Sequence, residues 1–144
     1  MRRTISMVAL VLATWAGVSR AADDTLCFSL GRSELVVLGS FTSELLAVSD
    51  ELGVVDYSGD FKVEQVLKGD ARVAGKTMKV SVVRFEMGPD DKHPLVAKAG
   101  RCILMLTSAR GATPAFVTAD EWFGVQPPWP WLARDLKRLS GARR

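Results

Sequence analysis

The segment Phe61–Gly69, with the sequence FKVEQVLKG, constrains the fold more than any other stretch of the chain. Its residues mostly alternate between apolar and polar types, which is the period that a half-buried β-strand requires. Gly69 and Asp70 predict the turn at which this strand ends. The pattern also predicts that one face of the strand carries Phe61, Val63, Gln65 and Leu67.

Runs of similar character lie on both sides of this segment. Strands are predicted over residues 34–43, 77–85, 101–107 and 115–118. The run 101–107 is apolar almost throughout, as in a strand covered on both faces. Gly39 predicts a bulge or a bend, and residues 45–58 read as a loop or a ragged hairpin. Five short strands and few helices predict a small β-barrel that is closed or partly open.

One helix is predicted after a proline-rich break at residues 126–131. Pro130 suits the first position of a helix and Gly141 suits its C-terminal end. Leucines recur on one face at positions 132, 136 and 139, and the opposite face carries the cations Arg134, Lys137 and Arg138. We therefore expect a barrel domain over residues 22–128 and a basic helix over residues 129–144.

Residues 1–21 have the pattern of a secretory signal peptide. Two arginines precede an apolar run over residues 5–18, and small residues before position 22 favour cleavage after Ala21. The run is short for a membrane span, which needs about 20 residues, so an uncleaved anchor is the less favoured alternative. We therefore expect an exported protein, periplasmic or secreted, assuming a bacterial source.

The charge of the chain changes once the predicted signal peptide is removed. The full sequence has 19 basic and 16 acidic residues, and loss of Arg2, Arg3 and Arg20 would make the mature chain neutral. Residues 133–144 carry five basic residues against one acidic, whereas residues 22–132 carry eleven basic against fifteen acidic. A net acidic barrel is not the composition of a nucleic-acid-binding groove, so no nucleic-acid partner is expected.

Cys27 and Cys102 are the two cysteines of the chain, and both belong to the part expected to be exported. Disulfides form and persist in that environment, so we expect one bridge between them. Such a bridge would stabilise the fold by roughly 4 kcal/mol. Two unpaired, buried thiols are the alternative.

The sequence contains no motif typical of catalysis or metal binding. His93 is its one histidine and no closely spaced cysteine pair occurs, whereas a structural zinc site uses four Cys or His ligands. Glycine-rich phosphate loops and Gly-x-Ser-x-Gly turns are also missing from the sequence. We therefore expect no enzyme activity, no metal and no cofactor. A Cys–His pair is the catalytic alternative, and it requires a free cysteine.

The candidate partner surface lies near the C-terminus. Exposed tryptophan beside arginine is typical of interface hot spots, and this composition predicts a surface made of Trp122, Trp129, Trp131, Arg134, Lys137 and Arg138. Alternatively, the rings close one mouth of the barrel and pin the helix there. Both interpretations can hold together, with Trp131 inside and the basic face outside. A weak contact between the basic helix and anionic lipid is a third interpretation.

Three segments resemble the netrin-like, TIMP-like variety of the OB-fold, where TIMP stands for tissue inhibitor of metalloproteinases. Residues 33–39, 61–69 and 100–106 resemble the first, second and fourth strands of that family. The resemblance spans most of the barrel. It implies a mostly β fold, a small five-stranded OB-like β-barrel, here followed by a C-terminal amphipathic helix.

The best-known activity of that family uses a cysteine at the mature N-terminus to chelate the zinc of a protease. Here Cys27 lies five residues beyond the predicted cleavage site. The expected function is therefore a non-catalytic protein- or peptide-binding module of the cell envelope, with an envelope or extracellular protein as its partner. A metalloprotease inhibitor of TIMP-like type is the alternative.

Overall fold

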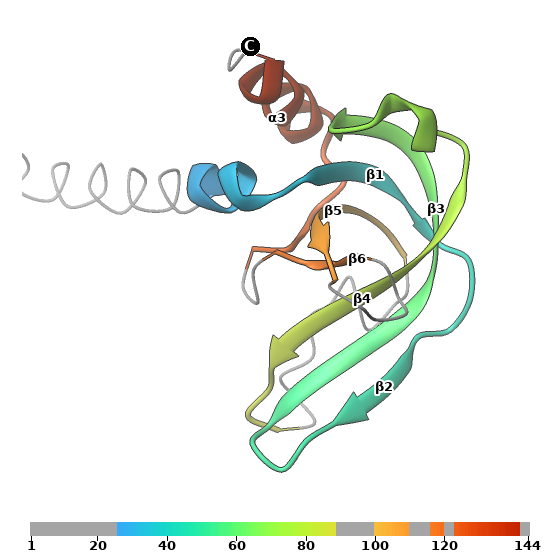
Figure 1. The fold of residues 1–144 in the computed structure, drawn as a ribbon, viewed down its shortest axis with the longest axis vertical. Helices are drawn as coiled ribbons and strands as arrows, with labels where there is room; N and C mark the ends of the chain where they lie inside the picture. The colour runs from blue at the N-terminus through green and yellow to red at the C-terminus, as the bar shows by residue number, and fades with distance from the viewer. Residues whose placement is uncertain (1–25, 89–99, 110–115, 120–122, 142–144) are drawn as a thin grey trace, which may run out of the picture.

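The structure is a computed structural model that describes residues 26–88, 100–109, 116–119 and 123–141 (Figure 1). Its strands are β1 (Leu35–Phe41), β2 (Leu46–Ser49), β3 (Val54–Lys68), β4 (Thr77–Phe85), β5 (Arg101–Ser108), β6 (Phe116–Thr118) and β7 (Val125–Gln126). Its helical segments are residues 26–32, the 3₁₀ turn Ala71–Val73 and α3 (Pro130–Gly141). The predicted signal peptide, His93 and Trp122 lie outside the described residues. Within the described ranges, none of the helices has the length and hydropathy to cross a bilayer.

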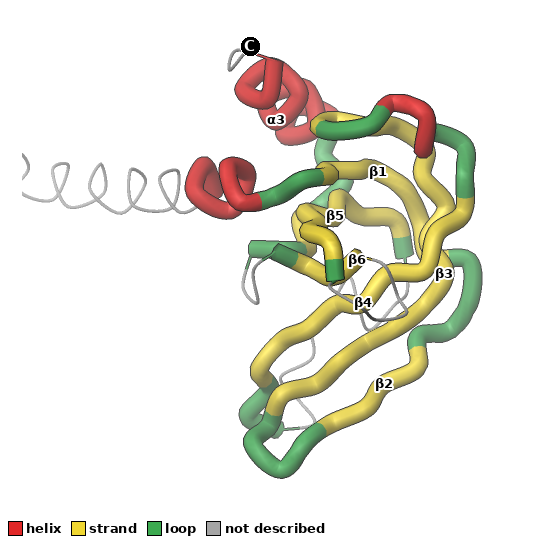
Figure 2. The backbone as a smooth tube through the Cα atoms, in the orientation of Figure 1, coloured by secondary structure: helices red, strands yellow, loops and turns green. Residues whose placement is uncertain are grey.

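Five strands close into a barrel in the order β1-β3-β4-β6-β5, and β5 pairs back onto β1. Neighbouring strands of the barrel are antiparallel, except for the parallel pair of β4 and β6. β2 extends the sheet beside β3, and β7 pairs with β5. The predicted fold, a mostly β, five-stranded OB-like barrel followed by a C-terminal helix, is confirmed (Figure 2).

β3 is the longest strand and pairs with three others. Its first half pairs with β4 and β2, and its second half pairs with β1. The sequence predicted a strand only from Phe61 onward and offered a loop or a ragged hairpin for residues 45–58. The hairpin is confirmed, with β2 and the start of β3 as its arms. Gly59 interrupts an alternation that would otherwise have extended the prediction, since Val55, Tyr57 and Phe61 all face the core.

β1 and β5 are buried on both faces, so their successive residues belong to two hydrophobic clusters. The interior cluster fills the barrel and includes Leu35, Val37, Phe41, Phe61, Val63, Cys102, Leu104 and Leu106. The exterior cluster joins the barrel wall to α3 and to helical residues 26–32 through Leu30, Val36, Leu38, Leu67, Ile103, Met105, Leu132, Ala133 and Leu136. The expectation that residues 101–107 are covered on both faces is confirmed.

Two β-bulges change which face the side chains of β3 occupy. The register between β1 and β3 shifts twice along the second half of β3. The prediction that Gln65 and Leu67 share the face of Phe61 is therefore wrong. Gln65 is exposed, and Leu67 packs in the exterior cluster beneath α3.

Gly39 lies at one of these bulges, where β3 passes very close to β1. A Cβ atom at this position would lie 2.0 Å from the carbonyl oxygen of Lys62 and 2.8 Å from the ring of Phe61. Only glycine lets the two backbones approach so closely. The bulge predicted at Gly39 is confirmed.

Replacement of Gly39 by alanine is expected to lower the free energy of unfolding by at least about 2 kcal/mol, because the backbone of β3 must move to accept the methyl group. Urea denaturation followed by circular dichroism measures this change. Gly141→Ala is the matched control, since nothing lies within 4 Å of its Cβ position. The control should change stability by less than about 0.5 kcal/mol. Equal stability of both variants would contradict the close approach at Gly39.

Candidate functional site

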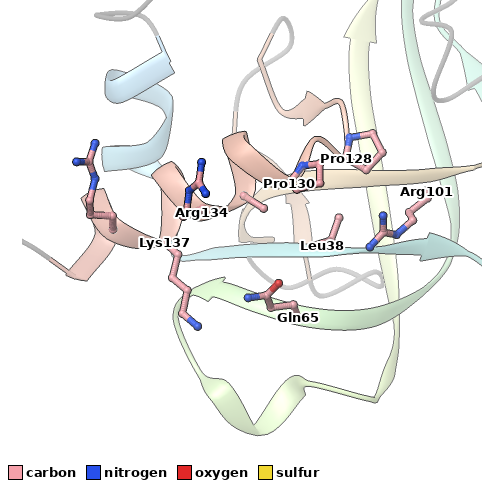
Figure 3. Close-up of a pocket in the computed structure, with 9 residues that line it drawn as sticks. Leu38, Gln65, Arg101, Pro128, Pro130, Arg134 and Lys137 are labelled. Carbon is pink, nitrogen blue, oxygen red and sulfur yellow. The ribbon is translucent and has the colours of Figure 1, made fainter.

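A groove of about 540 Å³ lies between α3 and the barrel wall (Figure 3). Three barrel strands supply one side of it, through Leu38 of β1, Gln65 of β3 and Arg101 of β5. The other side consists of the segment between β7 and α3, through Pro128, and of α3 itself, through Pro130, Ala133, Arg134, Lys137 and Arg138. The groove therefore combines an apolar lining with a rim of cations.

Four cations and no carboxylate line this groove. Arg101 is already engaged, because its Nε donates to Oε2 of Glu64 at 2.9 Å and its Nη2 lies 2.9 Å from the same oxygen. Arg138 Nη2 lies 4.0 Å from Oδ1 of Asp135. Arg134 and Lys137 have no ion-pair partner within the described residues. These two side chains therefore carry the uncompensated positive charge of the groove.

The pairing with Glu64 determines how available Arg101 is to a ligand. The hydrogen bond from Arg101 lowers the pKa of the Glu64 carboxyl below its ordinary value, and a bond from Ser40 Oγ at 3.3 Å adds to this effect. Glu64 is thus ionised at neutral pH and holds Arg101 at the rim. Both side chains are partly exposed, so the pair adds little to stability.

Two tryptophans lie at the start of α3, one directly before its first residue and one directly after it. Trp129 and Trp131 are 50% and 52% exposed, and their rings stack with centroids 5.4 Å apart and planes inclined by 24°. Trp129 lies between Pro128 and Pro130, which both line the groove. The expectation that Trp131 points inside while the basic face points outside is therefore wrong for the tryptophan, which is half exposed. Both rings offer an exposed apolar surface beside the cations.

The structure brings together only part of the predicted partner surface. The cations Arg134, Lys137 and Arg138 are exposed on α3, as the helical pattern predicted. Leu139 was expected on the buried face of the helix but is 40% exposed, so Leu132 and Leu136 anchor α3 without it. The barrel side of the groove was missed, because its residues come from three strands that meet only when the barrel closes.

The predicted disulfide is wrong, because Cys27 and Cys102 are both free thiols. Cys102 belongs to the interior cluster and is fully buried. Cys27 is exposed on helical residues 26–32, which pack through Leu30 onto the opposite face of the barrel wall. The wall therefore separates the two sulfur atoms. Burial raises the pKa of the Cys102 thiol to about 12, which makes it unreactive in the folded protein.

A second group of polar side chains lies where β3 begins and β4 ends. The hydroxyl of Tyr57 donates to Glu86 Oε1 at 2.7 Å, and Arg84 Nε lies 3.7 Å from the same oxygen. Burial, together with this hydrogen bond, raises the pKa of Tyr57 to about 12. The phenol is therefore protonated at physiological pH and acts as a hydrogen-bond donor that links the two strands.

In the described ranges no cluster of three or more His, Cys, Asp or Glu side chains is placed to hold a metal ion. No protein-family model matches this chain, and a search of curated proteins found no match either. The geometry and charge of the groove therefore carry the functional proposal.

The two thiols are expected to react very differently with Ellman's reagent. Without any reductant, the native protein should release one equivalent quickly from exposed Cys27, and a second only after unfolding exposes Cys102. Cys27→Ser should abolish the fast phase and keep the slow one. Release of thiols only after treatment with a reductant would contradict the separation of the two cysteines.

Proposed function

We propose that this protein is an exported, non-catalytic protein-binding module, and that the groove between α3 and the barrel binds an acidic segment of a partner protein. The observation that carries the proposal is the lining itself, which presents four cations and no carboxylate. Arg134 and Lys137 lack a counter-charge within the described residues. An acidic segment would supply the charges that these two cations need.

The apolar part of the groove supports a polypeptide as the ligand. The apolar surface that a bound chain can cover comes mainly from Pro128 and Pro130, because the other apolar lining residues, Leu38 and Ala133, are each only 6% exposed. The prolines restrict the backbone on both sides of Trp129, which does not itself line the groove but lies between two residues that do. A half-exposed aromatic pair beside arginines is the composition of an interface hot spot.

Three aromatic rings of the barrel strands give no support for a nucleic acid as the partner. Single-stranded nucleic acids bind OB barrels by stacking on exposed aromatic side chains of the barrel face. Here Phe41 and Phe61 contact each other edge to face at a centroid distance of 5.0 Å inside the barrel, and Tyr57 is buried with them. These rings fill the core, so they are not available for stacking on bases.

The TIMP-like inhibitor stays a separate prediction. It depends on Cys27 and not on the groove. In that family the inhibitory cysteine must be the first residue of the mature chain. The mass of the exported protein tests it directly: a chain that begins at Ala22 argues against inhibition through Cys27, and one that begins at Cys27 favours it.

Reversal of one groove charge is expected to weaken binding of an acidic peptide. A fluorescein-labelled peptide with four glutamates serves as the probe, and its glutamine counterpart shows how much of the binding depends on charge. Arg134→Glu or Lys137→Glu should raise Kd roughly three- to tenfold at low salt, as expected for partly exposed ion pairs. Fluorescence anisotropy measures the change.

Lys76→Glu is the matched control, because Lys76 is also exposed but does not line the groove. If Lys76→Glu weakened binding as much as Lys137→Glu does, binding would depend on net charge alone, and this result would contradict the proposal. Stronger binding to vesicles of anionic lipid than to the peptide would favour a membrane surface as the ligand instead.

Loss of the Glu64 carboxylate is expected to have the opposite effect. Glu64→Gln removes the counter-charge of Arg101 and leaves that guanidinium free to meet the ligand. The same peptide should then bind roughly two- to fivefold more tightly. Unchanged or weaker binding in this variant would show that Arg101 takes no part in the site.

A further inference from the structure

β2 lies at the edge of the sheet, at the end of the molecule remote from α3 (Figure 1). Among the described residues it pairs only with β3, and all four of its residues are exposed. Leu46 and Val48 are 67% and 62% exposed. An edge strand with exposed apolar side chains is a template for pairing with another chain.

The apolar side chains of β2 contribute to neither hydrophobic cluster. Leu46 and Val48 pair with Ser58 and Asp56, whereas the other two residues of β2 pair with the core residues Tyr57 and Val55. Leu46 and Val48 therefore lie on the face of the ribbon that is turned away from the core. Because they are exposed, these two side chains add no buried apolar area to the described fold.

The edge is four residues long and preformed. The Asp50 carboxylate accepts hydrogen bonds from the backbone N–H groups of Leu52 and Val54 at 2.8 and 2.9 Å, which holds the turn between β2 and β3. Natural edge strands are commonly protected by lysine or proline. Neither occurs within Leu46–Ser49. An added strand would therefore meet an edge that is already extended by its pairing with β3.

Acidic residues flank the edge on both sides. Glu44 precedes β2 and Glu51 follows it, and both are exposed with no ion-pair partner in the part of the chain that the structure describes. A hollow of about 360 Å³ beside Leu46 is lined by Glu44, and also by Asp60 and Lys79, which pair with each other at 3.5 Å, so Glu44 carries its uncompensated charge. A basic side chain would fit this charge at either end of an added strand.

The same charges disfavour a second copy of this chain as the occupant. If two β2 strands paired antiparallel about residues 47 and 48, Glu44 of one copy would lie opposite Glu51 of the other. Like charges placed directly opposite each other destabilise a strand pair. A partner with basic ends fits the edge better than β2 itself does.

We propose that the free edge of β2 is a second protein-binding site, which takes an extended segment of a partner protein as an added β-strand. The segment is apolar at alternate positions, so that it covers Leu46 and Val48, and it carries Lys or Arg at each end. Backbone hydrogen bonds provide the affinity, and the flanking charges provide the selectivity. This site is separate from the groove and opposite to it in charge.

The peptide KVTITVK, labelled with fluorescein, tests this inference by fluorescence anisotropy. It should bind the wild-type protein and shift the ¹⁵N NMR signals of residues 46–49. Val48→Lys places a like charge on the edge and should weaken binding at least about tenfold. Leu52→Lys is the matched control, because Leu52 is 78% exposed but lies in the turn outside the strand. That control should keep wild-type affinity within about twofold.

Three results would overturn the inference. A KVTITVK peptide that is N-methylated at all of its inner residues has no inner N–H group to donate along either of its edges, so undiminished binding would exclude strand addition. Equal weakening by Val48→Lys and Leu52→Lys would leave only an effect of charge. A dimer in sedimentation velocity that Val48→Lys dissociates would make the edge an interface between copies.

Lys137→Glu should leave KVTITVK binding intact, because Lys137 lies in the groove and not at the edge. The two proposals can therefore fail independently of each other.

Discussion

The two-sided burial of β1 and β5 is the constraint on which the rest of this structure depends. Alternate residues of these strands fill the barrel, and the residues between them form the wall on which α3 and helical residues 26–32 pack. Loss of the interior cluster would open the barrel, and loss of the exterior cluster would release the helix. The groove exists only because the helix lies on this wall, so the candidate site inherits its geometry from the same two strands.

The two proposed sites differ in the sign of their unpaired charges. The groove beside α3 is lined by cations, whereas Glu44 and Glu51 flank the edge of β2 at the other end. The two surfaces would therefore select ligands of opposite charge and would not compete for one segment. If both proposals hold, one molecule would bind two different segments of a partner, or two partners, at the same time.

Much of the barrel could be predicted from local patterns. The alternation around Phe61, the apolar run at residues 101–107 and the glycine at position 39 predicted strands and a bulge that the structure contains. The leucine and arginine spacing after Pro130 predicted α3 and its basic face. Predictions failed where a distant contact decides the outcome, as for Gln65 and for the pairing of the cysteines, because the bulges and the barrel wall are not local properties.

The sequence by itself determined which segments form strands and which helix is amphipathic, because periodicity depends only on neighbouring side chains. Tertiary structure alone decided which residues meet. Barrel closure brings Leu38, Gln65 and Arg101 to one groove, and it places Cys27 and Cys102 on opposite sides of the wall. It also leaves β2 unpaired on one side within the described chain. The physical reason is that strand register and sheet order are set by long-range packing, which no local pattern encodes.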